Sequence, residues 1–371
     1  MTLPSSGSPI SFSQLRSEFG TDGNNTSGPV RLGQYRRDDS SFSDKTAGTF
    51  VDQPLDTGVP TSGTITMDDM YGKSLNVIVD YHSGSADEGG TRPESARDRY
   101  NQSSGSGKWT VIGGYKSPPS NSGGTKVKIN VNKGIGGKDG ASETAVCALR
   151  TGTWDTNTML SVDIGSAGKI SGAGGDGGNG GSNANSGDSG EDANSALGIQ
   201  YSGTTVNIAS GGQIICGYGG GGGGGGAFDE DGFLFFDQER YAGGGGGGGG
   251  AGIPAGEGGS GGGGNSGGEG GEGGAAPAGG EQGGEGGEGG NNAGEAVAGR
   301  GGRGGDQEET GGESGSDGSG GSGEGAGGGT GEVGWAIRKS ASGIEWTLNN
   351  SGSIIGDQTS TSSGGGGTTV S

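Results

Sequence analysis

The residues able to perform catalysis are few and show no catalytic spacing. The chain has one histidine, His82, directly after the apolar stretch NVIVDY. A Ser-His-Asp triad would need a serine on a sharp strand-to-helix turn, and no motif of this kind is present. Carboxylates are numerous, but no pair stands apart as a general acid and base. We interpret His82 as a solvated or structural residue and expect no enzymatic activity and no catalytic residues.

Metal binding is equally weakly indicated. Two cysteines, Cys147 and Cys216, cannot form a zinc site, and we interpret them as small buried apolar residues. A disulfide between them stays open. The segment DEDG at 229–232 resembles the start of a calcium loop but lacks the later ligands and the closing glutamate. We therefore expect no metal and no cofactor.

The densest aromatic cluster is AFDEDGFLFFDQERYA at 227–242, between the eight-glycine tracts 219–226 and 243–250. Aromatic side chains among Asp, Glu and Arg are the usual composition of a recognition loop, and stacking on sugar rings is one use for them. Alternatively, residues 233–236 cover the end of the glycine-rich structure around them. The candidate binding residues are Phe228, Asp229, Asp231, Phe233, Phe235, Phe236, Arg240 and Tyr241.

The elements that must position this segment have an unusual composition. Glycine supplies 104 of 371 residues, only 25% are hydrophobic, and the formal net charge is -21. The second half carries almost all of this negative charge, which argues against nucleic acid and anionic membrane surfaces as partners. A conventional core for one domain of this length is not available, so order must have another source.

Residues 171–334 predict a bundle of polyglycine helices in the polyproline II conformation. Such a helix has three residues per turn and no internal hydrogen bonds, so closely packed glycine backbones can bond laterally. A flexible linker, a collagen helix and a cross-β stack fit the composition less well. GGEGGEGG at 267–274 and 283–290 would place Glu269 above Glu272 and Glu285 above Glu288, forming acidic edges that face water. Arg300 and Arg303, also one turn apart, would pair with such edges. We expect turns at 275–278, 291–298 and 306–310.

The first 75 residues contain one short motif three times, as SGSPISFSQL, SGPVRLGQY and SGTITMDDMY. Each copy predicts an extended piece that enters a helical turn, with Ser13 or Asp68 as the cap in two of them. No copy can fold alone, so we expect them to pack on each other or on a partner. The apolar and aromatic positions of the copies are Ile10, Phe12, Leu15, Val30, Leu32, Tyr35, Ile65, Met67, Met70 and Tyr71.

Residues 76–165 read as about five strands, which we interpret as a small antiparallel β-sandwich. A second motif occurs as VDIGSAGKISG (162–172), VNIASGGQIIC (206–216) and WTLNNSGSIIG (346–356). Apolar alternation on both sides of a Ser/Asn/Gly turn indicates β-hairpins that cap the bundle. The predicted fold is mainly β with irregular structure and very little α-helix, divided into 1–75, 76–165 and 166–371.

Glycine tracts joined by loops resemble the receptor-binding adhesins at the tips of long tail fibres in T-even-type phages. The motif SGTITMDDMYG is similar to N-terminal segments of structural proteins of marine phages, and hairpins that lead into glycine tracts, as in VNIASGGQIICGYGGGG, recur in phage fibre proteins. This resemblance implies a virion protein whose residues 1–75 attach to other tail proteins through the apolar positions of the motif. Its loops would bind a host surface glycan or an outer-membrane protein.

A purely structural virion part, such as a head fibre or tail spacer, is the alternative, and a depolymerase is a weaker one. A homotrimer is compatible with the resemblance, as is closure of the bundle within one chain. The N-terminus has neither the basic start nor the apolar run of a signal peptide, and no stretch is long and apolar enough for membrane insertion. We expect synthesis in the host cytoplasm and assembly into a virion tail or fibre.

Overall fold

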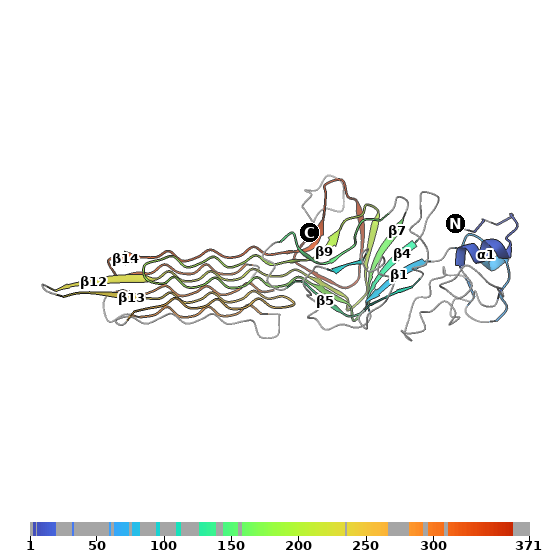
Figure 1. The fold of residues 1–371 in the computed structure, drawn as a ribbon. Coiled ribbons are helices and arrows are strands. Elements are labelled where there is room, and N and C mark those ends of the chain that lie inside the picture. Colours follow the sequence, from blue (N-terminus) through green and yellow to red (C-terminus); the bar gives the residue numbers. More distant parts are fainter. Residues whose placement is uncertain are drawn as a thin grey trace.

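The structure is a computed structural model of an elongated molecule (Figure 1). It describes residues 3–4, 6–19, 32, 59–60, 63–73, 76–81, 94–96, 109–112, 126–138, 144–154, 158–233, 236–265, 282–291, 296–307 and 311–358. A small N-terminal unit lies at one end, β-sheets occupy the middle, and a bundle of extended backbone segments forms the rest. Within these residues strands predominate and one α-helix is present, which confirms the prediction of a mainly β protein with very little helix.

The N-terminal unit contains α1 (Phe12–Phe19) and the 3-10 helix η2 (Asp68–Met70). Both begin with a reciprocal capping box, one residue of which accepts a hydrogen bond from the backbone of the other. Before α1, the Ser11 backbone N–H donates to Gln14 Oε1 at 2.8 Å, and the Gln14 N–H donates to Ser11 Oγ at 3.2 Å. Before η2, the Thr66 N–H donates to Asp69 Oδ2 at 2.7 Å. The expected caps, Ser13 and Asp68, are thus replaced by pairs that flank them.

The motif copies pack on one another. Leu15, Ile65 and Met70 are buried in one cluster with Leu3 and Val59. Ile10, Leu32 and Met67 pack against this cluster from the first, second and third copies. This joint core provides what no single copy could, because one turn of helix with a short extended piece cannot bury an apolar face alone.

The middle of the molecule consists of three sheets whose strands run almost entirely in parallel. The six-stranded sheet has the order β16 (Trp346–Asn350), β10 (Thr204–Ile208), β7 (Met159–Ile164), β4 (Lys126–Val131), β1 (Asn76–Tyr81), β3 (Trp109–Ile112). The four-stranded sheet has the order β17 (Ser353–Ile355), β11 (Gln213–Ile215), β8 (Lys169–Ser171), β5 (Gly134–Gly136). The five-stranded sheet has the order β18 (Asp357–Gln358), β15 (Trp335–Lys339), β9 (Ser195–Ile199), β6 (Cys147–Arg150), β2 (Glu94–Ser95).

These sheets are the three faces of a parallel β-helix. The chain visits the faces in turn, as β4-β5-β6, β7-β8-β9, β10-β11-β15 and β16-β17-β18, and each coil stacks on the one before. Within the described sheets of this region, only β3 pairs antiparallel, on the edge of β1. The predicted antiparallel sandwich for 76–165 therefore does not hold, because alternation of apolar residues is the same in parallel and antiparallel strands and does not reveal strand direction.

The repeated motif forms corners of the β-helix instead of hairpins. In each copy the two halves belong to different sheets, and each half pairs with the same half of the next copy, as in Val206↔Val162 and Ile214↔Ile170. The glycine shared by the copies lies where corners stack, and a Cβ on Gly168 would overlap the carbonyl oxygen of Val131. In the last copy β16 is shifted by two residues, with Val206 opposite Leu348, which keeps the same side chains facing inward.

The apolar core lies inside the β-helix and takes residues from all three faces, among them Ile129, Leu149 and Ile170. The sheets cross the predicted boundary at 165/166, since β15 to β18 return to the same β-helix after the glycine-rich region. The bundle is thus inserted into the coils at the corner between the second and third faces, through residues 172–194 and 216–334. Sequence order hid this arrangement because the coils are interrupted by more than a hundred residues.

Candidate functional site at the end of the polyglycine bundle

The bundle is held together by backbone hydrogen bonds that repeat every third residue. Gly174, Gly177 and Gly180 donate to carbonyls of 254–260, also three residues apart. Gly175, Gly178 and Gly181 donate to Tyr218, Gly221 and Gly224. A period of three with a different neighbour for each position is the pattern of a threefold extended helix, as predicted. The described segments are 172–181, 185–194, 216–226, 243–251, 256–263, 282–290, 298–305, 312–318 and 323–334.

The eight-glycine tract 219–226 lies at the centre. Segment 216–226 donates hydrogen bonds to 185–194, 243–251 and 312–318, and it accepts them from 172–181, 298–305 and 323–334. Every residue of both eight-glycine tracts is buried. A Cβ on Gly220, Gly223 or Gly225 would overlap a carbonyl oxygen of a neighbouring segment. The central segments therefore consist of glycine because a neighbour lies against each of their faces.

The outer segments carry a side chain at every third position. In 282–290 the exposed positions recur with this period and include Glu285 and Glu288, as predicted. Arg300 Nη2 lies 3.7 Å from Glu285 Oε2, and Arg300 Nε lies 3.4 Å from Glu288 Oε1. The predicted pairing of arginines with a neighbouring acidic edge is confirmed. These side chains are about half exposed or more, so each pair contributes at most about 1 kcal/mol. The Glu269–Glu272 edge lies outside the described residues.

The segment between the two glycine tracts is a β-hairpin formed by β12 (Ala227–Phe233) and β13 (Phe236–Ala242). Its ladder runs from Ala227↔Ala242 to Phe233↔Phe236. Six residue steps correspond to about 20 Å of extended chain. The hairpin projects beyond the bundle at the end of the molecule opposite α1 (Figure 1).

Both edges of the hairpin are clamped at its base. On one side β14 (Gly323–Glu324) pairs with Ala227 and Phe228. On the other side the Tyr241 backbone N–H donates to Asn265 Oδ1 at 3.0 Å, while Asn265 Nδ2 donates to the Glu239 carbonyl at 2.7 Å. The Phe228 and Tyr241 rings stack across the strands, with centroids 4.9 Å apart and planes inclined by 24°. The first residues of the hairpin therefore hold its direction as a continuation of the bundle.

The hairpin is strongly acidic. Residues 227–242 contain five acidic residues and one arginine. Asp229 is paired in register with Arg240, but Glu230 lies opposite Glu239, and like charges in that position destabilise a hairpin. The Tyr241 hydroxyl donates to Glu239 Oε2 at 2.8 Å, and this bond is the main cause that raises the tyrosine pKa. Such a surface suits a neutral or positively charged binding partner better than an anionic one.

The predicted binding residues divide into a base and a distal part. Phe228, Asp229, Arg240 and Tyr241 lie near the base, and Phe228 and Tyr241 are partly buried in their stack. The backbones of Asp231, Phe233 and Phe236 lie further out on the ladder, and Phe235 lies outside the described residues. Asn265 was not predicted. No signal in the sequence marks it, since its partners Glu239 and Tyr241 are more than 20 residues away.

The remaining predicted chemistry is placed as follows. Cys147 and Cys216 are both buried and free, which confirms their interpretation as apolar residues and excludes a disulfide between them. Among the residues that the structure describes, no group of three or more His, Cys, Asp or Glu could hold a metal ion. His82 lies outside the described residues, as do the expected turn at 275–278 and part of those at 291–298 and 306–310. In the described part of the chain no helix has the length and apolar character needed to cross a bilayer.

The predicted attachment residues form the N-terminal core more than its surface. Leu15, Ile65 and Met70 are buried, and Ile10, Leu32 and Met67 pack against them. Phe12 is 48% exposed and Tyr71 is partly exposed. Val30 and Tyr35 lie outside the described residues. Most of these side chains can therefore support attachment only by maintaining the fold of the unit, while Phe12 is available for direct contact.

Comparisons with protein-family models, with curated proteins and with solved structures give no match for this chain.

Proposed function

We propose that this protein is a tail-fibre or tail-tip adhesin of a phage, attached to the virion through residues 1–75. It recognises the host surface non-covalently through the β12–β13 hairpin. The observation that carries the proposal is the position of an aromatic and charged hairpin at one end of the molecule, opposite the N-terminal unit (Figure 1). A receptor-binding element needs this separation, because the anchor must stay on the particle while the tip meets the cell.

The bundle supports this proposal through its stiffness. Its segments exchange hydrogen bonds in several directions at once, so bending it would break many bonds together. The clamps at the hairpin base extend the same rigid body to the aromatic residues, which lowers the conformational entropy lost on binding. The opposed Glu230 and Glu239 are a further indication, since a cost to stability on an exposed tip is typical of a surface selected for contact.

The receptor class that fits best is a host surface glycan or an outer-membrane protein whose contact region is neutral or basic. The excess of acidic residues on the hairpin opposes binding to strongly anionic polymers. The depolymerase alternative gains no support, because no described residue group supplies a catalytic constellation at the tip.

Replacement of Phe233, Phe235 and Phe236 by Ser tests the proposal. We expect adsorption of virions to cells to fall at least about a hundredfold, because aromatic anchors dominate binding energy at such interfaces. Particle assembly and the thermal unfolding of the purified protein should stay unchanged, since the substituted positions lie at the far end of the hairpin ladder.

Met159→Ser is the matched control, because Met159 is an apolar side chain that is 50% exposed on the β-helix, away from the tip. It should leave adsorption intact. Normal adsorption of the triple variant would refute the adhesin proposal and favour a purely structural virion component. Loss of folding in the triple variant would show that these residues cover the end of the bundle.

A further inference from the structure

A second polar site lies on the β-helix, far from the hairpin. A cavity of about 520 Å³ opens where the six-stranded sheet meets the corner leading to the four-stranded sheet. This volume lies within the range of small-molecule sites. Its lining is mostly polar, with Asn130, Asp163, Asn207 and Asn349 on the sheet and Ser166 on the corner.

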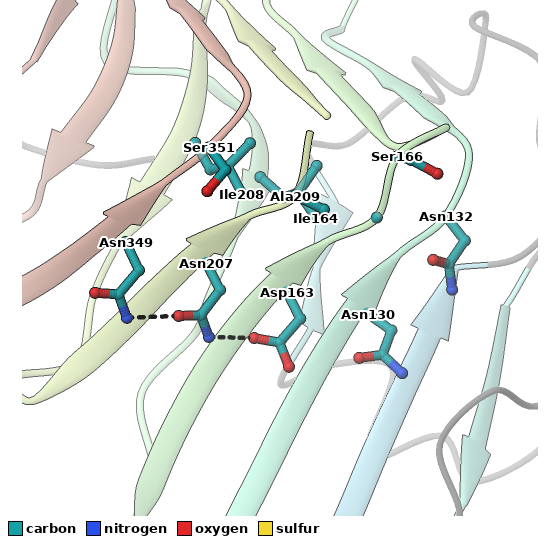
Figure 2. A pocket seen from close by; sticks show the side chains of 11 residues that line it. Asn130, Asn132, Asp163, Ile164, Ser166, Asn207, Ile208, Ala209, Asn349 and Ser351 are labelled. Atoms are coloured by element: carbon teal, nitrogen blue, oxygen red, sulfur yellow. Dashed lines mark hydrogen bonds between the residues drawn. The ribbon is translucent and has the colours of Figure 1, made fainter. Parts of the chain in front are cut away.

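The polar side chains of the sheet form one row across four neighbouring strands (Figure 2). Asn130 pairs in register with Asp163, Asp163 with Asn207, and Asn207 with Asn349. Adjacent parallel strands are about 4.8 Å apart, so the row presents a polar group at each such interval along the β-helix axis. Asn349 Nδ2 donates to Asn207 Oδ1 at 2.8 Å, and Asn207 Nδ2 donates to Asp163 Oδ1.

Asn130 interrupts this hydrogen-bonded row. Its side chain is buried, with 8% of the residue exposed, and it lines the cavity next to Asp163. Asn132 Nδ2 donates past it to Asp80 Oδ1 at 3.1 Å. For the carboxamide of Asn130 the described part of the chain offers no hydrogen-bond partner. A buried amide without a protein partner is costly, and folding alone gives no reason to keep one at this position.

The chemistry of the lining indicates a neutral ligand. The only carboxylate of the lining, Asp163, accepts from Asn207 and lies 3.4 Å from Lys128 Nζ, so its charge is already balanced. No cationic side chain lines the cavity, which disfavours phosphate and other anions. Carboxamides both donate and accept, as do sugar hydroxyls, and Ile164, Ile208 and Ala209 add apolar surface for the C–H face of a ring.

We propose that this cavity binds a neutral oligosaccharide that lies across the strands, with Asn130 hydrogen-bonded to one of its hydroxyl groups. The site is separate from the hairpin, and the proposal does not depend on the proposed function. It gives the β-helix a binding role of its own.

The test uses the purified full chain and isothermal titration calorimetry with maltohexaose, cellohexaose and chitohexaose at millimolar concentrations. We expect at least one of them to bind. Asn130→Leu, which is nearly isosteric, should weaken that binding about tenfold, because it removes a hydrogen bond from a buried site. The same variant should unfold at an equal or higher temperature than the wild type, since it removes an unpartnered buried amide.

Thr205→Val is the matched control, because Thr205 precedes Asn207 by two residues on the same strand and does not line the cavity. It should bind like the wild type. Asn349→Ala, at the exposed end of the row, provides a second test that does not depend on the folding of the Asn130 variant, and it should also weaken binding. Absence of binding to all three sugars would overturn the proposal, as would unchanged affinity in both the Asn130 and the Asn349 variants.

Discussion

A single methyl group at the centre of the bundle should unfold the protein at a markedly lower temperature. In Gly223→Ala the new Cβ would overlap the carbonyl oxygen of Asn179, and it would lie 2.9 Å from the Gly180 nitrogen. Both atoms belong to backbone, so no side chain can rotate away. Segment 172–181 must therefore move outward.

The magnitude follows from what that movement breaks. The bonds from Gly178 to Gly221 and from Gly181 to Gly224, 2.9 and 2.8 Å long, join the two segments on either side of the substitution. Two lost hydrogen bonds cost about 2 kcal/mol. Overpacking adds about 1–3 kcal/mol, for a total of about 3–5 kcal/mol. For a chain of this size that destabilisation lowers the unfolding temperature by about 6–10 °C.

Gly329→Ala is the matched control, because Gly329 lies on an outer segment where the nearest atom to a new Cβ is Ser189 Oγ at 3.5 Å. Its effect should be neutral, or stabilising by about 0.5 kcal/mol through the lower entropy of the unfolded chain. Differential scanning calorimetry on both variants gives the comparison. Equal unfolding temperatures would refute the conclusion that close packing of backbones holds the bundle together.

Two further predictions concern ionisable groups. Burial, followed by the charges of Asp176 and Asp192, raises the pKa of Glu191, so the folded state holds a proton more tightly than the unfolded chain and stability falls as pH rises through this range. Glu191→Gln should therefore be more stable than the wild type in urea unfolding at neutral pH and lose this advantage near about pH 3; an advantage that persists in acid would contradict the electrostatic cause. Burial also raises the pKa of Cys147 to about 12 and of Cys216 to about 11, so both thiols should resist iodoacetamide in the native protein and react after denaturation, as mass spectrometry can measure; rapid native labelling would show that the thiols are accessible.

The local features of the bundle could be predicted from the sequence because they depend on a period. Glycine at two of three positions, with Glu285 and Glu288 at the third, is sufficient to indicate a threefold helix with one exposed edge. The eight-glycine tracts on both sides of 227–242 likewise indicated two antiparallel segments joined by a connection. The motif copies of the first 75 residues indicated packing of small apolar units on each other, and their capping boxes lie within two residues of the expected caps.

The long-range arrangement could not be read in the same way. Alternating apolar residues gave the strands, but Val162 pairs with Val206 in parallel only because the chain completes a coil between them. The cavity residues Asn130 and Asn349 come from opposite ends of the β-helix sequence and meet through register alone. Asn265, which clamps the hairpin, shows no pattern that distinguishes it from other polar residues.

The sequence by itself therefore determined where the backbone is bare, where charge accumulates and which short segment carries aromatic side chains. Only the tertiary structure decided which segments are neighbours, that the glycine region is an insertion into a β-helix, and that the hairpin extends from the end opposite the N-terminal unit. The physical reason is that this protein is ordered largely by backbone hydrogen bonds. Every peptide group offers the same donor and acceptor, so the partner of each is set by the path of the chain and not by residue identity.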